Sequence, residues 1–186
     1  MHATSKLEGE HLHPKKDKAY RKAVTLGQRY PARYGGCAQA TFAAIADALN
    51  LKGEEVFKAL IGLSGGVGNM GRGACGAMAG AAAAISLKFG VGRNALKRNP
   101  EAILKVKDRI YELVEKVGGR FLEEFGSYLC RDIQLALFGK AFNLRNPEAY
   151  MEFKQVAWPK ACSREVVAKA VGWAVEVILE AEERKP

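Results

Sequence analysis

Residues 74–89, with the sequence ACGAMAGAAAAISLKF, form a stretch in which nearly every side chain is small or apolar. Alanine is the strongest helix former, and a helix that is apolar on all sides is stable only when other elements cover it. Gly76 and Gly80 are four residues apart, a spacing that lets a neighbouring helix approach closely. We therefore expect a buried Ala/Gly-rich central helix around which the remaining chain packs.

The remaining chain shows helical periodicity and almost no strand pattern. Residues 101–117 place apolar side chains on one face, with lysine or glutamate outside: Ile103, Val106, Ile110, Leu113 and Val117. Similar patterns predict helices over residues 14–30, 37–49, 54–60 and 130–138, between Pro147 and Pro159, and from about Ser163 onward. The expected fold is all-α: a compact, single-domain helical bundle.

Several residues are typical of helix ends or connections. Pro31 should interrupt the first helix, because proline lacks the amide hydrogen that a helix interior needs. Residues 94–100 should form a basic loop, and Gly118-Gly119 should end the helix that begins at residue 101. Ser127 should cap the helix over residues 130–138.

Length and composition indicate one globular domain. The chain has 186 residues, of which 48% are hydrophobic, enough to bury a core. Residues 1–13 are interpreted as a flexible tail, and residues 14–186 as a single helical four-cysteine domain. His2, His11 and His13 lie in this tail at no metal-binding spacing. No apolar run is long enough to cross a membrane and no apolar leader is visible, so we expect a cytoplasmic protein without a membrane span.

The four cysteines, Cys37, Cys75, Cys130 and Cys162, require a functional explanation. None belongs to a C-x-x-C pair, so the zinc-ribbon and thioredoxin signatures are absent. Each lies at or near the start of a predicted helix, where the dipole and free amide groups favour an anion and should lower a thiol pKa. Basic residues stand beside them in the sequence: Arg33, Arg72, Arg131, Lys160 and Arg164.

Such cysteines have three interpretations. Gathered in space, they could bind a metal or an iron–sulfur cluster. Taken in pairs, they could cycle between dithiol and disulfide without any cofactor, in one of three complete pairings. They could also be small buried hydrophobic residues without chemistry. Only the convergence of the sulfur atoms in three dimensions separates these interpretations.

The glycine-rich segment over residues 62–76 is the expected lid of a cysteine site. Residues 66–71 match G-x-G-x-x-G, but the dinucleotide fingerprint needs a preceding strand, and the preceding sequence is helical in pattern. We instead expect the glycines to let the backbone wrap close to whatever Cys75 binds. The candidate binding residues of this segment are Gly71, Arg72, Gly73 and Gly76. Gln39, two positions beyond Cys37, could donate a hydrogen bond to sulfur, the alternative being an ordinary exposed helix residue.

A formal charge of +9, from 29 lysines and arginines against 20 aspartates and glutamates, raises the question of nucleic-acid binding. The basic residues are scattered, with one local cluster at residues 94–98 and no recognition-helix or RRM signature. We expect no nucleic acid, and a basic module that binds an acidic partner is a lesser alternative.

No Ser/His/Asp triad can be assembled, and the sequence does not decide whether the protein is an enzyme. A redox partner protein is expected but not identified. A homodimer is a further possibility, since an apolar patch left by the alanine-rich helix could form its interface.

Three cysteine-bearing motifs and a fourth cysteine together resemble a known family. They read Cys37-Ala-Gln-Ala, Cys75-Gly-Ala-Met-Ala-Gly, Cys130-Arg-Asp-Ile and Cys162. This pattern resembles the C-GCAxxG-C-C family of small prokaryotic redox-active proteins, from about Tyr34 to about Ile178. Two departures are Gly36, where many members have asparagine, and a long segment over residues 139–161.

The resemblance implies redox chemistry at the four cysteines. The pattern is also similar to the haem-free N-terminal domain of split-Soret cytochromes, for which an iron–sulfur centre has been proposed. We therefore expect an iron–sulfur cluster for electron transfer or redox sensing, with [2Fe–2S] favoured over [4Fe–4S]. The alternative is a metal-free thiol–disulfide oxidoreductase or redox switch that needs no cofactor. The chain has no C-x-x-C-H motif and so no c-type haem attachment site.

Overall fold

The computed structural model describes residues 14–98, 100–158, 162 and 165–184, and the predicted tail over residues 1–13 lies outside them. Within these ranges the chain is helical, and an isolated bridge between Ala74 and Leu129 is the extent of β-pairing. The helices are α1 (Pro14–Tyr34), α2 (Cys37–Leu49), α3 (Glu54–Ala59), α4 (Gly76–Phe89), α5 (Arg93–Arg98), α6 (Pro100–Phe125), α7 (Cys130–Phe138), α8 (Pro147–Val156) and α9 (Val167–Glu183), and a 3₁₀ turn, Leu60–Leu63, follows α3. The prediction of an all-α fold is confirmed.

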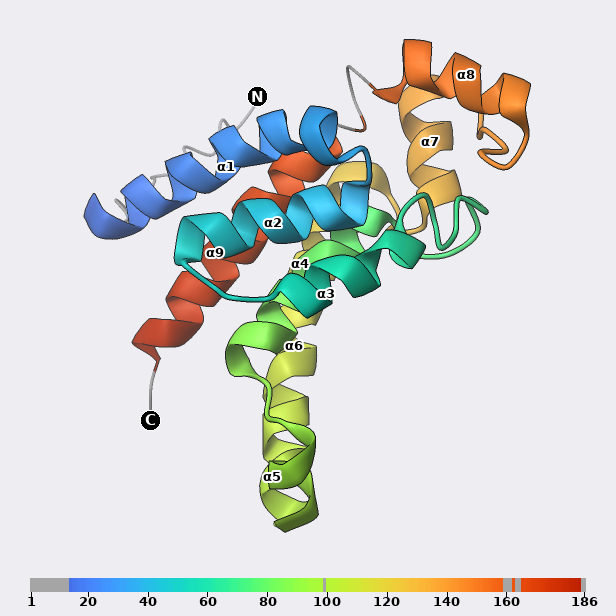
Figure 1. The fold of residues 1–186 in the computed structure, drawn as a ribbon. Coiled ribbons are helices and arrows are strands. Elements are labelled where there is room, and N and C mark those ends of the chain that lie inside the picture. The colour runs from blue at the N-terminus through green and yellow to red at the C-terminus, as the bar shows by residue number, and fades with distance from the viewer. Residues whose placement is uncertain (1–13, 99, 159–161, 163–164, 185–186) are drawn as a thin grey trace, which may run out of the picture.

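The alanine-rich helix α4 lies at the centre, as predicted. It packs against α2, α6 and α9, while α1 crosses α2 and α9 from outside (Figure 1). We call α1, α2, α4, α6 and α9 the main bundle. The close approach depends on Gly80, where an added Cβ would lie 2.4 Å from the Ala38 carbonyl oxygen and 2.9 Å from the Thr41 Cβ. Small residues therefore set the distance between α2 and α4.

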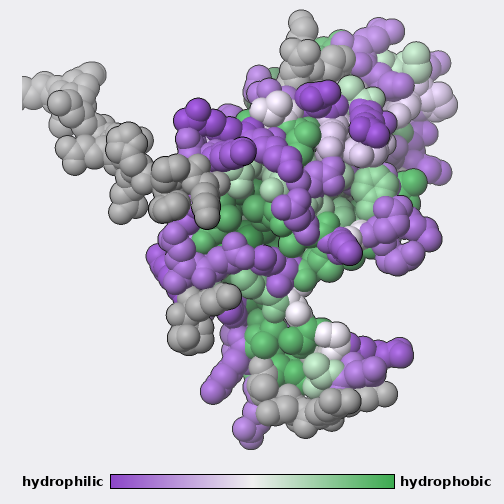
Figure 2. Space-filling view, turned by 60° about the vertical axis from the view of Figure 1, so that its left-hand side comes forward, coloured by the Kyte–Doolittle hydropathy of each residue, from purple (hydrophilic) through white to green (hydrophobic). Residues whose placement is uncertain are grey.

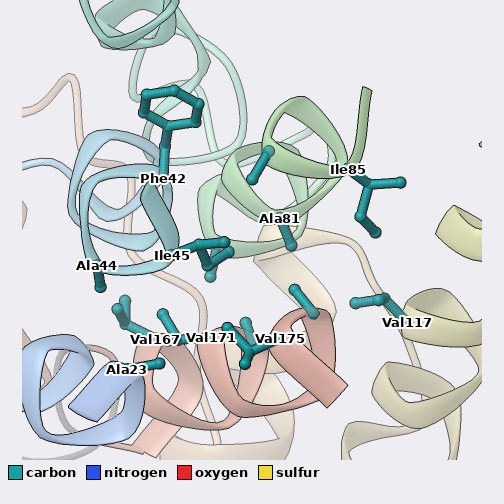
Figure 3. Close-up of a cluster of buried hydrophobic side chains, with 14 of the residues drawn as sticks. Ala23, Phe42, Ala44, Ile45, Ala81, Ile85, Val117, Val167, Val171 and Val175 are labelled. Carbon is teal, nitrogen blue, oxygen red and sulfur yellow. The ribbon is translucent and has the colours of Figure 1, made fainter. Parts of the chain in front are cut away.

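The core of the main bundle is made of alanines that interleave with larger aliphatic and aromatic side chains. Ala44, Ala81 and Ala84 are fully buried, so neighbouring helices can approach them closely. The larger side chains fill the space between the helices (Figure 3): Phe42, Ile45, Ile85, Val117, Val171 and Val175. This core holds the first residues of α2 and α4, and with them Cys37 and Cys75, in place.

The end of α1 differs from the prediction, because the helix continues through Pro31 to Tyr34. Proline removes one amide donor, and in the last turn of a helix this loses a single hydrogen bond. The helix ends instead at Gly35, which adopts a left-handed conformation at φ +71° and donates its amide to the Pro31 carbonyl at 2.9 Å. The sequence signal for this end was the glycine rather than the proline.

Two further boundary predictions were wrong. The basic segment near residue 94 forms helix α5 rather than a loop, since alanine, leucine, lysine and arginine are all good helix formers. Helix α6 runs through Gly118-Gly119 to Phe125 instead of ending there. Phe121 and Phe125 pack on Trp173, with ring centroids 5.3 and 6.2 Å away, and this tertiary contact outweighs the low helix propensity of glycine.

Ser127 is not the N-cap of α7, which is Leu129. The Ser127 hydroxyl instead accepts a hydrogen bond from the Leu129 amide at 3.0 Å and donates to the Asp132 carboxylate at 2.9 Å. It therefore stabilises the turn that leads into α7 from two residues further upstream. This turn places Cys130 at the first position of the helix.

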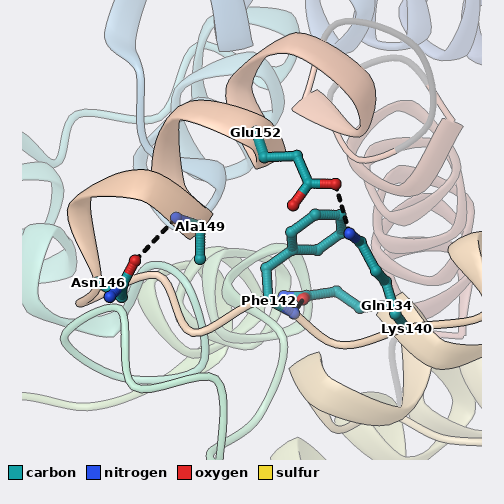
Figure 4. Close-up of polar contacts among 6 residues, drawn as sticks. All are labelled: Gln134, Lys140, Phe142, Asn146, Ala149 and Glu152. Carbon is teal, nitrogen blue, oxygen red and sulfur yellow. Dashed lines mark hydrogen bonds and ion pairs between the residues drawn. The ribbon is translucent and has the colours of Figure 1, made fainter.

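Residues 130–158, which we call the small lobe, carry a second and smaller buried cluster, while Ile133 of α7 is buried with the core of the main bundle. The smaller of the two is an aromatic cluster centred on Phe142, Leu144, Phe153 and Ala157. Asn146 is the N-cap of helix α8, and its side chain accepts a hydrogen bond from the Ala149 amide at 2.9 Å (Figure 4). The prediction of a short helix after Pro147 is confirmed, while Pro159 lies outside the described residues.

The described helices include none that is both long and apolar enough to cross a membrane. Hydrophilic side chains cover much of the face in Figure 2, and hydrophobic ones are visible on the arm formed by α5 and the first part of α6. Leu104 on this arm is 61% exposed. The arm projects away from α7 and α8 (Figure 1).

Candidate functional site

All four cysteines line one cavity of about 1050 Å³. The cavity lies between the end of α1, the start of α2, the glycine-rich segment and the small lobe. Its cysteines come from separate elements of the fold: Cys37, Cys75, Cys130 and Cys162. The folding of the chain thus gathers residues that lie far apart in the sequence.

Cys37 is the first residue of α2 and follows the Gly35 that ends α1. The glycine-rich segment covers this start: the Ser64 hydroxyl accepts from the Ala38 amide at 3.3 Å, and the Gly65 amide donates to the Cys37 Sγ at 3.5 Å. The sulfur therefore accepts a backbone hydrogen bond from the predicted lid.

Cys75 and Cys130 are brought side by side by the isolated bridge between Ala74 and Leu129. The Cys75 amide donates to the Tyr128 carbonyl at 2.8 Å, and the Cys130 amide donates to the Gly73 carbonyl at 3.0 Å. Cys75 then caps α4 and Cys130 begins α7. These two hydrogen bonds connect the main bundle to the small lobe directly beside the thiols.

Cys162 lies in the connection between α8 and α9 and packs against the aromatic cluster. Its amide donates to the Ala157 carbonyl, five residues back, at 3.2 Å. A helical turn closed by a hydrogen bond over five residues is rare in proteins overall, and those that occur are frequently found at functional sites. Three of the four cysteines therefore begin or cap a helix, as predicted. The predicted cap Ser163 and the flanking Lys160 and Arg164 lie outside the described residues.

Glycines let the backbone pass close to the thiols. A Cβ added to Gly76 would lie 2.3 Å from the Cys37 Sγ, and one added to Gly66 would lie 2.7 Å from the Cys130 Cβ. Gly66 also has a φ of +70°, a conformation that other residues rarely adopt. Gly66, which the sequence did not single out for this role, belongs to the cysteine site because of this contact.

Gln134 on α7 is the side chain that contacts a thiol most directly. It is 1% exposed, and its Nε2 donates to the Cys130 Sγ at 3.3 Å. Its Oε1 accepts from the Phe142 amide at 2.7 Å, which connects α7 to the segment before α8 (Figure 4). Gln134 was not among the predicted site residues, although a glutamine four residues after a cysteine on one helix can reach its sulfur.

Within the described structure, Gln39 neither donates a hydrogen bond to a sulfur nor lies exposed on its helix, which were the two predictions for it. It is buried at 9% exposure and lines the cavity, but its Nε2 donates to the Phe57 carbonyl at 3.2 Å. Of the predicted lid residues, Gly71 is buried and Gly73 contacts Cys130 through its carbonyl. Arg72 is exposed and lies outside the cavity lining.

Burial, rather than the helix starts, has the largest effect on the pKa values of Cys75, Cys130 and Cys162. Loss of solvent raises the pKa of Cys130 to about 12, the charge on Cys37 adds to the rise, and the Gln134 hydrogen bond lowers it in part. Burial, and then the charges of neighbouring cysteines, likewise raise the pKa of Cys75 and of Cys162 well above the ordinary value. The expectation that helix dipoles lower these pKa values was wrong, because desolvation of the thiolate outweighs the dipole.

The donor set suits a soft metal or an iron–sulfur cluster, since thiolates are the ligands that these centres prefer. Among the described residues, however, no three cysteine, histidine, aspartate or glutamate side chains are close enough to hold one metal ion as they stand. All four cysteines are free thiols. Metal binding therefore requires the thiols to draw closer together and to lose their protons.

Three basic residues line the cavity that the sequence analysis did not single out: Arg29, Arg145 and Lys154. Arg33 and Arg131, which are adjacent to cysteines in the sequence, lie outside the lining. Proximity in the sequence was therefore a poor guide to which cations face the cavity. On a helix, neighbouring residues point in different directions.

A comparison with known families identifies a match that covers most of the chain. The family model described as "Putative redox-active protein (C_GCAxxG_C_C)" matches residues 34–177, and this range contains all four cysteines. No curated protein and no solved structure matches the chain. The resemblance seen in the sequence is confirmed, and the chain belongs to the C_GCAxxG_C_C family.

Proposed function

We propose that this member of the C_GCAxxG_C_C redox-active family binds an iron–sulfur cluster through Cys37, Cys75, Cys130 and Cys162, and uses it for electron transfer or redox sensing. The observation that carries the proposal is that four cysteines from distant parts of the chain line one cavity. A buried hydrophobic role would not require all four to meet there. A [2Fe–2S] cluster is the first candidate and [4Fe–4S] the second.

The surroundings of the thiols favour a negatively charged centre. Within the described residues no aspartate or glutamate lines the cavity, whereas two arginines and one lysine do. The Gly65 amide and the Gln134 side chain each donate a hydrogen bond to a sulfur. Hydrogen bonds to cluster sulfurs stabilise the reduced form and raise the reduction potential. When bound, the cluster would supply one-electron transfer.

The high thiol pKa values fit the same proposal. A buried thiolate without a partner is unfavourable, which is why burial keeps Cys75 and Cys130 protonated in the metal-free protein. A bound cation reverses this preference and deprotonates the thiol outright. Cluster binding should therefore release protons and stabilise the fold, because the ligand binds the folded chain alone.

The experiment is anaerobic reconstitution with ferrous iron and sulfide, followed by iron and sulfide analysis and visible absorbance. We expect a coloured protein with a fixed stoichiometry of iron and acid-labile sulfide per chain. We also expect a higher melting temperature than that of the metal-free protein. Colourless protein without bound iron after anaerobic reconstitution would contradict the proposal.

Single cysteine variants test the ligands one at a time. Cys75→Ser should lose most of the bound iron, since serine oxygen is a harder ligand than thiolate. The matched control is Ala79→Ser, which adds the same hydroxyl one turn further along α4 and outside the cavity lining. A Cys75→Ser protein that keeps the full iron content and spectrum would remove Cys75 from the ligand set.

A metal-free thiol–disulfide protein is the second candidate, and the observation in its favour is that the thiols are not gathered around one point. In that case two thiols would give up two protons and two electrons to an oxidant and form one disulfide. The raised pKa values of Cys75 and Cys130 argue against it, because the thiolate is the reactive species. A count of free thiols after mild oxidation distinguishes the two: four free thiols in metal-free protein exclude the disulfide mechanism.

A further inference from the structure

The cavity that the four cysteines line is much larger than a metal centre bound by four sulfurs would fill. A metal–thiolate bond is about 2.3 Å long, so a centre held by four sulfurs occupies a small part of the space. The cavity measures about 1050 Å³. This volume is at the upper end of the range of roughly 300–1,000 Å³ found for pockets that hold organic ligands. Space therefore remains for a second, larger molecule.

The residues that line the cavity differ in exposure, with buried thiols at its floor and solvent-exposed basic residues at its rim. Cys75 and Cys130 are 7% and 9% exposed and form its floor. Arg29, Arg145 and Lys154 also line it but are exposed to solvent, so they form its rim. Cations at this rim favour negative charge within the cavity, but screening by solvent makes their effect fall off with distance. The rim cations are better placed to contact a ligand that enters from solvent.

The rim cations differ from several other basic residues of the molecule in having no acidic partner within the described part of the chain. Elsewhere on the molecule, outside the cavity lining, Lys140, Lys169 and Lys88 each pair with a glutamate. Among the described residues, the ion pairs include none that involves Arg29, Arg145 or Lys154, and the described lining holds no carboxylate that could pair with them. Such a rim attracts anions.

Aromatic side chains complete the wall beside these cations. Tyr34 comes from α1, Tyr150 from α8 and Trp158 from the segment after α8, and all three line the cavity while keeping part of their surface exposed. Rings of this kind offer a flat apolar surface on which a planar ligand can stack. Lys154 lies over the Tyr150 ring at 5.8 Å, so charge and aromatic surface are adjacent.

We infer that this rim is a binding site for an organic anion with a flat ring system, such as a ring that carries a phosphate group. The cations Arg29, Arg145 and Lys154 contact the anionic group, and Tyr34, Tyr150 and Trp158 contact the ring. The ligand then lies between solvent and the buried thiols. This inference goes beyond the proposed cluster and holds whether or not the thiols bind iron.

The test uses two probes that share one ring. Flavin mononucleotide carries a phosphate, and riboflavin has the same ring without it. Their binding to the full chain is measured by the change in flavin fluorescence, with inorganic phosphate as competitor. We expect the phosphorylated probe to bind about tenfold more tightly or better, as one charge-assisted contact provides. High phosphate should displace it. Equal affinities for the two probes, or no binding of either, would overturn the inference.

Charge variants locate the site. Arg145→Gln combined with Lys154→Gln should weaken flavin mononucleotide binding about tenfold or more and leave riboflavin binding nearly unchanged. The matched control is Arg93→Gln combined with Lys105→Gln, which removes the same charge from the arm, outside the cavity lining. If both double variants bind like the unaltered chain, or if both lose affinity equally, the rim is not the site.

Iron content separates this inference from the proposed function. Each binding measurement is made on protein whose iron and sulfide contents are known. Protein that takes up a cluster but does not discriminate between the two probes contradicts the rim site alone. Protein that binds flavin mononucleotide as expected but never retains iron contradicts the cluster alone.

Discussion

The main bundle and the small lobe each contribute two cysteines to one cavity, but they hold them in different ways. Cys37 and Cys75 begin or cap helices whose other residues pack into a large, alanine-rich core. Cys130 begins the small lobe and Cys162 follows it, and the described cluster of this lobe, with the side chains packed against it, contains only a few residues, most of them aromatic. In the described part of the chain, α8 makes no extensive contact with any other helix, whereas α2 and α4 pack along much of their length.

This difference indicates how the sulfurs could approach one another. A large core allows few alternative arrangements, while a small cluster with few contacts opens at a lower free energy. The small lobe is therefore the part that can move Cys162 relative to a fixed Cys37 and Cys75, while the bridge between Ala74 and Leu129 keeps Cys130 beside Cys75. Four predictions test the contrast, in order of decreasing effect on the stability of the whole chain.

The first prediction concerns the main bundle. Phe42 is 2% exposed within the core, and Phe42→Ala should lower the free energy of unfolding by about 3–5 kcal/mol. For a chain of this size, that corresponds to a fall of roughly 6–20 °C in melting temperature. Far-UV circular dichroism on heating measures the shift. Leu104→Ala, at a site 61% exposed, is the control and should change the melting temperature little.

The second prediction applies the same substitution to the small lobe. Phe153→Ala should lower the melting temperature of the whole chain by less than half as much as Phe42→Ala, because it removes packing from the smaller cluster. It should instead raise the rate of Cys162 alkylation at least about tenfold, as a fall of ~1.4 kcal/mol in local opening free energy does. Mass spectrometry after iodoacetamide treatment measures each cysteine separately.

The control for Phe153→Ala is Met151→Ala, which removes a side chain that is 55% exposed on the same helix. Its Cys162 alkylation rate should match that of the unaltered chain. If Phe153→Ala and Phe42→Ala lower the melting temperature equally and expose all four cysteines together, the two regions unfold as one unit and the contrast fails.

The third prediction tests the hydrogen bonds of Gln134 within the small lobe. Gln134→Leu keeps the bulk but leaves the Phe142 amide unpaired, which should cost about 1–3 kcal/mol in the free energy of unfolding. The lost bond to Cys130 should also raise the pKa of that thiol further, because the glutamine lowers it. Urea denaturation and the pH dependence of Cys130 alkylation measure the two effects. Leu135→Ala, at the neighbouring exposed position, should produce neither.

The fourth and smallest effect lies in the main bundle and depends on pH. The Tyr30 hydroxyl donates to the Asp47 carboxylate between α1 and α2, and this bond raises the pKa of Tyr30 from 10.0 to about 12. Because the folded pKa is the higher one, the stabilisation is fully present below about pH 10 and is lost as the pH rises toward 12.

Tyr30→Phe should therefore be less stable than the unaltered chain at pH 8, and the gap between them should close between about pH 10 and 12. Urea unfolding midpoints across this range measure it, with Tyr111→Phe at an exposed position as the control. A gap that stays constant to pH 12 would show that the hydrogen bond does not perturb the Tyr30 pKa.

Much of the fold could be predicted from local sequence patterns. The alanine-rich segment around Gly80 predicted a buried central helix, and the segment from Cys37 to Leu49 predicted α2 with its observed bounds. In one case a wrong prediction arose because a distant contact outweighed a local preference. Gly118-Gly119 did not end α6, because Phe121 packs on Trp173 beyond it.

The candidate site was only partly predictable. The cysteine pattern and the family could be read from the sequence, and the match over residues 34–177 confirms the family. Gln134 and the rim cations Arg29, Arg145 and Lys154 were missed, while Arg72 was singled out and is exposed outside the cavity. Which side chains face a cavity depends on how helices are placed relative to one another, and the residues next to a cysteine in the sequence contain little of that information.

The sequence by itself determined an all-helical fold, its central helix and its membership of a four-cysteine redox family, because helix periodicity and a motif are local properties. The tertiary structure decided that the four thiols meet in one cavity, that burial raises the pKa values of Cys75, Cys130 and Cys162, and that two regions of unequal core size hold the cysteines. Desolvation and packing depend on atoms far apart in the chain, so these properties exist only once the helices have assembled.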